Sequence, residues 1–150
     1  MSRNALTGIA GVHHVVSELS RRGLVALPTT KNIAAYDIVA LNPQGTKHAN
    51  IQVKASSKRV GFFPMPPVEK VRAGIRDFYV FVRWLSRKGC YECFLLTGRQ
   101  ARDAVRGEID AQRIKIRTGT RKVEFPCVTV GPRNAKAAER WWLAWLKWNL

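Results

Sequence analysis

Apolar residues in the first third of the chain follow a helical spacing and then form short runs. Over residues 7–22 they recur every three or four positions, which predicts an amphipathic helix that Thr7 can cap and Gly23 can end. The apolar stripe of this helix consists of Ile9, Val12, Val15, Val16 and Leu19. Runs at residues 24–27, 35–41 and 49–54 predict three strands, and the turn formers at 42–45 join the last two into a hairpin.

The middle of the chain predicts a loop, a second hairpin and a short helix. Residues 56–67 are rich in Gly, Pro and Ser, which is typical of an irregular loop. Dense β-forming residues at 77–84 and 90–96, separated by a turn at 86–89, predict two paired strands. Residues 97–105 predict a short capped helix. The elements follow one another without a repeat or a linker long enough to divide the chain.

The last third of the chain is basic and then rich in tryptophan. Residues 109–122 are polar, and Ile114 and Ile116 alternate with three basic residues, which predicts a strand with one basic face. Those basic residues are Arg113, Lys115 and Arg117. Residues 134–150 predict a final helix, and its tryptophans Trp141, Trp145 and Trp148 share one stripe. Such a stripe is more often core than a platform for stacking bases, although Trp142 lies off it.

Length and composition favour one folded domain over residues 1–150. The chain has 150 residues, of which 46% are hydrophobic, and this is enough for a real core. No apolar stretch approaches the roughly 18 residues of a membrane span, and no signal-type segment opens the chain, so we expect a cytoplasmic protein with no membrane partner. Cys90, Cys93 and Cys127 are an odd number, so we expect thiols and strand residues rather than a disulfide framework or zinc site.

Charge is the bulk property that says most about partners. The 26 Lys and Arg against 10 Asp and Glu give a net charge of +16. A basic field of this size indicates a polyanionic partner, of which nucleic acid is the natural candidate. An acidic membrane surface or an acidic protein is also compatible with the charge alone.

Three polar residues of the first predicted hairpin form a candidate site. Gln52 and Lys54 are two residues apart on one strand, so they point to the same sheet face, and Asp37 begins the partner strand. A carboxylate and an amide oxygen can hold Mg²⁺, while a nearby Lys can orient the attacking water and stabilise phosphoryl charge. Such a group would hydrolyse a phosphodiester. The plainer interpretation is that Gln52 and Lys54 form the solvated face of an amphipathic strand and that Asp37 is an ordinary strand-edge residue.

With this helix and hairpin, residues 8–57 resemble the PD-(D/E)XK nuclease superfamily, in particular its small Holliday-junction-resolvase-like members. The resemblance implies an α/β fold with a restriction-endonuclease-like core, a mixed central sheet flanked by the N-terminal helix and the Trp-rich C-terminal helix. It also implies that Asp37 and Gln52 bind Mg²⁺ or Mn²⁺ and that Asp37, Gln52 and Lys54 are catalytic. A homodimer acting on DNA is a further expectation from the family.

The chain departs from the family pattern at two positions. Where the family commonly has Glu in its first helix this chain has Val12, and where it usually has Asp or Glu this chain has Gln52. Asp37 is therefore the only carboxylate in the matched site, and each lost charged ligand weakens a magnesium site. The sequence leaves open a metal-dependent nuclease, a nuclease fold that binds nucleic acid without cutting it, and a basic module for an acidic protein.

Other polar residues have less specific interpretations. His13 and His14 are adjacent on the predicted helix, so they point about 100° apart and cannot both face one metal. Glu18 is expected to pair with Arg21 and Arg22 on the helix surface. The basic residues expected to contact nucleic acid are Lys58, Arg59, Arg113, Lys115, Arg117, Arg121 and Lys122, with Lys70, Arg72 and Arg76 as further cationic positions.

Overall fold

The computed structural model of the chain describes residues 2–30, 36–57, 62–117 and 126–129. Beyond Arg113, the last turn of the second helix is described by its backbone alone. The elements are, in chain order, α1 (Arg3–Arg21), β1 (Val25–Pro28), β2 (Ile38–Leu41), β3 (His48–Ser56), β4 (Phe62–Pro64), the 3₁₀ turn η1 (Val68–Lys70), β5 (Asp77–Leu85), β6 (Cys90–Thr97), α2 (Gly98–Arg117) and β7 (Cys127–Thr129).

The first helix begins four residues earlier than the sequence pattern predicts. Ser2, and not Thr7, is the N-cap, and its hydroxyl accepts a hydrogen bond from the Ala5 N–H at 3.3 Å. The Thr7 hydroxyl instead donates back to the Arg3 carbonyl within the helix at 3.0 Å. The predicted stop is confirmed, because Gly23 has φ +82°, a conformation that other residues rarely adopt.

Five strands form one mixed sheet in the order β1-β2-β3-β5-β6. The pairs β1 with β2, β2 with β3 and β5 with β6 are antiparallel, so both predicted hairpins are confirmed. The central pair β3 with β5 is parallel, with Gln52 beside Tyr79 and Lys54 beside Phe81. The segment between β3 and β5, predicted as an irregular loop in its first part, contains β4, which pairs with β7 in a separate small sheet. The mixed α/β architecture expected from the resemblance is therefore present.

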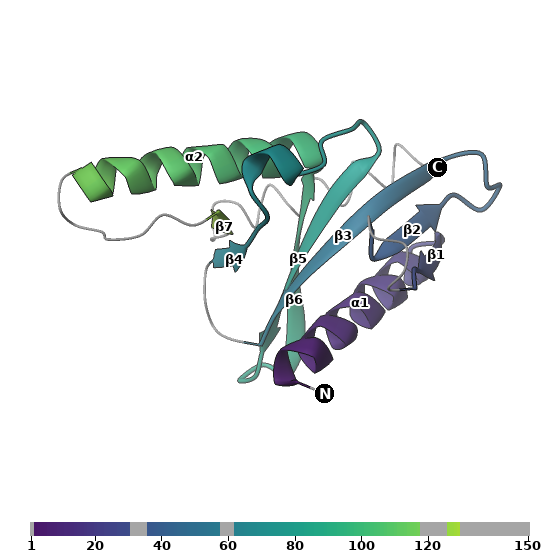
Figure 1. Cartoon of the computed structure of the whole chain (residues 1–150). Coiled ribbons are helices and arrows are strands. Elements are labelled where there is room, and N and C mark those ends of the chain that lie inside the picture. Colours follow the sequence, from purple (N-terminus) through teal and green to yellow (C-terminus); the bar gives the residue numbers. More distant parts are fainter. Residues whose placement is uncertain (1, 31–35, 58–61, 118–125, 130–150) are drawn as a thin grey trace.

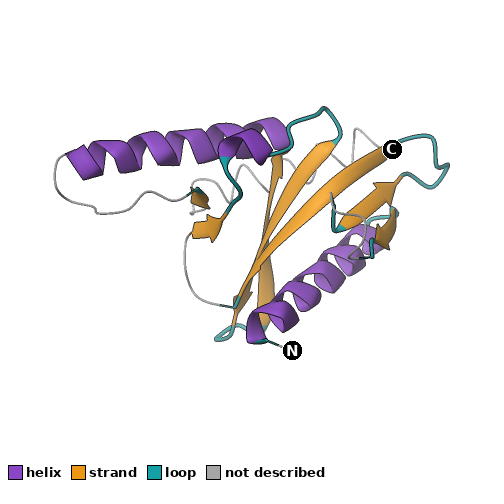
Figure 2. Cartoon of the chain, viewed as in Figure 1, coloured by secondary structure: helices purple, strands orange, loops and turns teal. Residues whose placement is uncertain are grey.

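The two helices lie on opposite sides of this sheet (Figure 1). Figure 2 shows the strands, in orange, between the two helices, in purple. On the α1 side, Val15 and Leu19 pack on a cluster that includes Ile51 and Val53 of β3 and Val80 of β5. Gly11 allows this contact, since a Cβ there would lie 2.5 Å from the Cβ of Ala55. On the α2 side, the core consists of Phe63, Met65, Val71, Tyr79, Phe81, Phe94, Ala101, Val105 and Val128.

The second helix corrects two predictions. It runs without interruption from Gly98 to Arg117, so the short helix at residues 97–105 was too short and the basic strand at residues 113–117 was wrong. Ala101, Val105 and Ile109 continue a four-residue spacing that packs on the aromatic core, and Gln112, fully buried, extends the same face. The helical spacing of these buried residues is therefore a stronger signal than the alternation of Ile114 and Ile116 with basic residues.

Two expectations concern membranes and the C-terminal helix. Among the described residues, no helix is long and apolar enough to cross a membrane. The predicted Trp-rich helix at residues 134–150 lies outside the described residues.

Candidate active site

Asp37 and Gln52 meet across the β2–β3 hairpin. Ile38 pairs with Ile51, so Asp37 stands opposite Gln52. The Gln52 side-chain amide nitrogen donates to the Oδ2 atom of Asp37, and the Val53 backbone N–H donates to the same oxygen at 2.7 Å. The Asp37 N–H in turn donates to the Ile51 carbonyl at 3.0 Å. The carboxylate is therefore fixed to the strand by a charge-assisted bond as well as by the register.

Lys54 lies on the same face of β3 as Gln52, two residues further along. Its neighbours on this face of β5 are Phe81, directly beside it, and Tyr79, beside Gln52. Asp37, Gln52 and Lys54 are each half-buried. Among the described residues, no carboxylate forms an ion pair with Lys54. The predicted trio thus shares one sheet face. No acidic side chain among the described residues neutralises the Lys54 ammonium group.

The α1 helix does not supply a ligand to this face. Val12 packs against the apolar cluster on the opposite side of the sheet, where Val53 also points. Glu18 is held by Arg21 at 3.2 Å and by Arg22, as the sequence predicts, and the hydrogen bond from Arg22 lowers the pKa of Glu18. The Glu18 carboxylate is thus engaged by arginines of its own helix.

The histidines and cysteines, all within the described residues, form no metal-binding cluster. His14 stacks on Tyr91 with ring centroids 4.4 Å apart, and burial lowers its pKa. The three cysteines, all within the described residues, form no disulfide, and burial raises the pKa of Cys93 to about 12. Among the described residues, no group of three or more His, Cys, Asp or Glu side chains could hold a metal.

The donors at the candidate site fit a weakly held magnesium ion. Mg²⁺ commonly keeps several waters and binds one or two carboxylates together with phosphate oxygens of the substrate. Asp37 provides the carboxylate. Gln52 turns its amide nitrogen toward Asp37, so half a turn of the amide would present its oxygen instead. Two such donors would leave most of the coordination shell to water and substrate.

Tyr36, Arg72 and Tyr79 adjoin the site, and no sequence pattern indicates that they meet. The Arg72 guanidinium lies 4.8 Å from the centre of the Tyr36 ring, and its Nη1 donates to the Tyr36 hydroxyl at 2.6 Å. The Arg72 backbone N–H donates to the Tyr79 hydroxyl at 3.0 Å. Arg72 and Tyr36 are separated by 36 residues, so only the tertiary fold reveals the contact.

The cationic residues expected to contact nucleic acid are only partly described. Arg113 is exposed on α2, 3.9 Å from Asp110. Lys115 and Arg117 lie in the last turn of α2, where only the backbone is described. Lys58, Arg59, Arg121 and Lys122 lie outside the described residues.

Comparison with known proteins gives one informative result. No family model and no curated protein matches the chain. Among solved structures, the fold is similar to that of a bacterial homing endonuclease, I-Ssp6803I, with 15% sequence identity and a TM-score of 0.54. The match covers 99% of this chain and 95% of the other. The chain therefore has a fold that is also found in a nuclease.

Proposed function

We propose that this chain is a metal-dependent endonuclease of the PD-(D/E)XK type that hydrolyses phosphodiester bonds in DNA. The observation that carries the proposal is the joining of Asp37 and Gln52 across the hairpin, with Lys54 on the same sheet face. The fold shared with a solved structure supports it, since that protein is named as a homing endonuclease.

Each residue has a distinct role in this proposal. Asp37 and Gln52 would hold Mg²⁺ or Mn²⁺, and the ion would supply Lewis-acid polarisation of the phosphodiester and a more acidic attacking water. Lys54 places an ammonium group where negative charge develops on the phosphoryl oxygens and orients the water. Val53 contributes through its backbone N–H, which keeps the Asp37 carboxylate in place.

The net charge of +16 supports DNA as the partner. Each Lys or Arg that contacts a phosphate releases a counterion, so binding should weaken steeply as salt rises. We further propose that residues 1–150 act as one domain and that two copies form a homodimer, which light scattering of the purified protein would test.

A second candidate function is DNA binding without cleavage. It is favoured by Val12, which packs against the apolar cluster on the opposite side of the sheet, so that Asp37 is the one acid among the positions matched to the family. The orientation of Gln52, which gives its amide nitrogen to Asp37, also fits a purely structural role for the pair.

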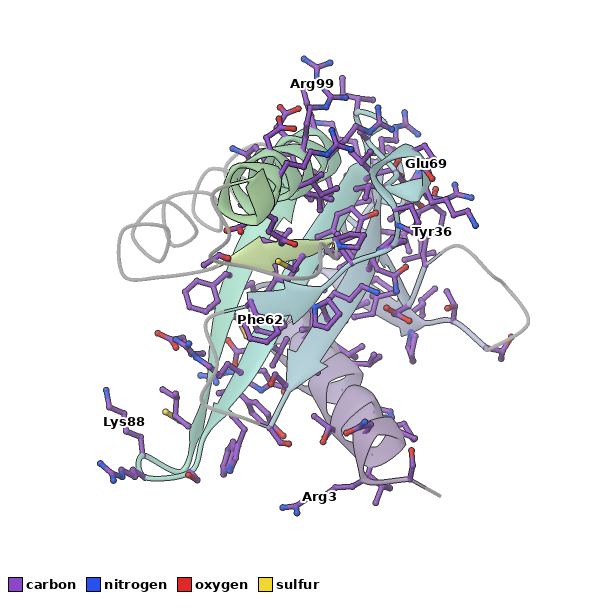
Figure 3. All side chains as sticks on the ribbon, turned by 60° about the vertical axis from the view of Figure 1, so that its left-hand side comes forward. Arg3, Tyr36, Phe62, Glu69, Lys88 and Arg99 are labelled. Carbon is purple, nitrogen blue, oxygen red and sulfur yellow. The ribbon has the colours of Figure 1, made fainter. Side chains whose placement is uncertain are left out.

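Cleavage assays with Lys54→Ala separate the two functions. Wild-type protein is incubated with supercoiled, linear, branched and single-stranded DNA in Mg²⁺ or Mn²⁺, beside Lys54→Ala and a matched control, Lys88→Ala. Lys88 is exposed in the β5–β6 turn, at the opposite end of the molecule from Tyr36 in Figure 3. Metal-dependent cleavage that falls about 100-fold or more in Lys54→Ala, and is unchanged in Lys88→Ala, supports the nuclease. Salt-dependent binding with no cleavage of any substrate supports the second function.

A further inference from the structure

We infer that Arg72 is a phosphate-binding residue of the candidate active site, gripping the DNA backbone beside Asp37. This inference rests on the proposed function for its reaction, although it predicts a DNA contact whether or not the chain cuts. No motif in the sequence marks Arg72, and its assignment comes from four contacts in the structure.

The backbone around Arg72 is held from three directions. Its N–H donates to the Tyr79 hydroxyl at 3.0 Å, and Tyr79 lies beside Gln52 in the sheet. The Arg102 guanidinium of α2 donates twice to the preceding carbonyl, that of Val71, at 3.1 and 2.7 Å. Gly98 fits closely against the Arg72 carbonyl, because a Cβ at this position would overlap the carbonyl oxygen. The same Cβ would lie 2.8 Å from the Cα of Ala73. The position of Arg72 is thus fixed before any ligand binds.

The side chain of Arg72 is also oriented. Its guanidinium lies over the Tyr36 ring and donates one hydrogen bond to the Tyr36 hydroxyl. Tyr36 directly precedes Asp37 in the chain, so this contact brings the cation to the segment just before β2 that carries the candidate metal ligand. Stacking on an aromatic ring restrains the flexible side chain and lowers the entropy lost when a ligand binds.

The charge of Arg72 is available to an anion. Its side chain is exposed, and no described carboxylate forms an ion pair with it. Arg83, by contrast, is paired with Glu92, and Arg22 with Glu18. A guanidinium has five N–H donors in a planar fork that matches two phosphate oxygens. With one donor directed to Tyr36, the remaining edge suits a phosphodiester of the DNA backbone.

The test compares Arg72→Ala, Arg72→Lys and Tyr36→Phe with a matched control, Arg87→Ala, in the exposed β5–β6 turn. Two quantities are measured on duplex DNA: kcat/KM with Mg²⁺, and the dissociation constant across a range of salt in EDTA. We expect Arg72→Ala to lower kcat/KM about 10- to 100-fold and to reduce the salt slope of log Kd by about 1 relative to the control. Arg72→Lys should keep most of the salt slope but lose part of kcat/KM, because an ammonium lacks the planar fork.

The salt slope decides the inference independently of the proposed function. A salt slope in Arg72→Ala equal to that of Arg87→Ala would show that Arg72 contacts no phosphate, even if Lys54→Ala abolishes cleavage. If the wild type does not cut DNA, the slope measured in EDTA still decides the inference. Tyr36→Phe, which keeps the ring but loses the hydroxyl, should leave the slope unchanged and alter kcat/KM less than Arg72→Ala. A thermal melt of each variant identifies any loss caused by unfolding.

Discussion

The two faces of strand β3 differ in burial and in residue type. Ile51 and Val53 point to the α1 side, where they are 1% and 8% exposed and form part of a continuous apolar cluster. Gln52 and Lys54 alternate with them and point to the other side, where each is half-buried. One strand therefore places a stability residue and a candidate chemical residue next to each other, and substitutions at adjacent positions should have separable effects.

The face opposite α1 is itself divided. Over β5 and β6 it is closed by α2 and by aromatic side chains such as Phe81 and Phe94. Over β2 and β3 it carries Asp37 and Gln52, whose hydrogen bonds to each other and to the Val53 N–H offset the cost of partial burial. Rigid aromatic packing beside this polar half supports the geometry of the candidate site.

The largest effect on stability is expected from Ile51→Ala. This change removes a side chain that is 1% exposed, and it should lower the free energy of unfolding by about 2 to 5 kcal/mol through lost burial and a cavity. Lys54→Ala, three residues away on the other face, should change it by less than about 1 kcal/mol. Urea unfolding of the two variants measures both values, and equal losses would contradict the division between faces.

A smaller effect, which depends on whether metal is present, is expected from Gln52→Glu. The substitution replaces the hydrogen bond to Asp37 with two facing carboxylates, which should lower the melting temperature in EDTA at neutral pH. The second carboxylate should also tighten Mg²⁺ binding, so that Mg²⁺ raises the melting temperature more than in the wild type. Gln52→Ala is the control. A melting temperature of Gln52→Glu that does not respond to Mg²⁺ would argue against a metal at this position.

The smallest effect concerns pH and the α1 side of the sheet. Burial, offset in part by Glu18 and reinforced by Arg22, lowers the pKa of His14 below its ordinary value of 6.5. The folded state therefore favours neutral His14, and the stability that this contributes is present above pH 6.5 and is lost as the pH falls through the folded-state pKa. His14→Phe keeps a ring against Tyr91 but does not titrate.

The corresponding measurement is urea unfolding of wild type and His14→Phe at pH 7.5 and at pH 5.5. The wild type should lose more stability between the two values. Glu18 does not confound the comparison, because its pKa is lowered from 4.5 and its contribution is lost only at more acidic pH. Equal losses in the two proteins would contradict the assignment of the pH dependence to His14.

The sequence predicted the parts of the molecule that depend on local patterns. The strict alternation in β3 and the short turn after β2 were sufficient to predict that Asp37 can lie beside Gln52, and the structure adds the hydrogen bond that joins them. The length of α2 was underestimated because Gln112, a polar residue, occupies a buried position that a pattern of apolar residues does not mark.

Long-range contacts were not accessible in this way. Strands β4 and β7 are three residues each and lie more than 60 residues apart, so their pairing leaves almost no local signal. The contact of Arg72 with Tyr36 depends on the parallel pairing of β3 with β5 and on the path of the chain between them. The composition identified the cationic character of the chain but could not identify which arginine lies beside the site.

Cleavage by an Asp37→Asn variant tests the central claim most directly. Asparagine retains an oxygen that can accept the Val53 N–H, so the fold should persist while the one charged ligand of the candidate site is lost. The control is Asp103→Asn, an exposed residue of α2. We predict Mg²⁺-dependent DNA cleavage by the wild type and by Asp103→Asn, and at least about a 100-fold loss in Asp37→Asn with DNA binding retained. Cleavage by Asp37→Asn at the wild-type rate, or no cleavage by any of the three proteins, would contradict a nuclease active site built on Asp37.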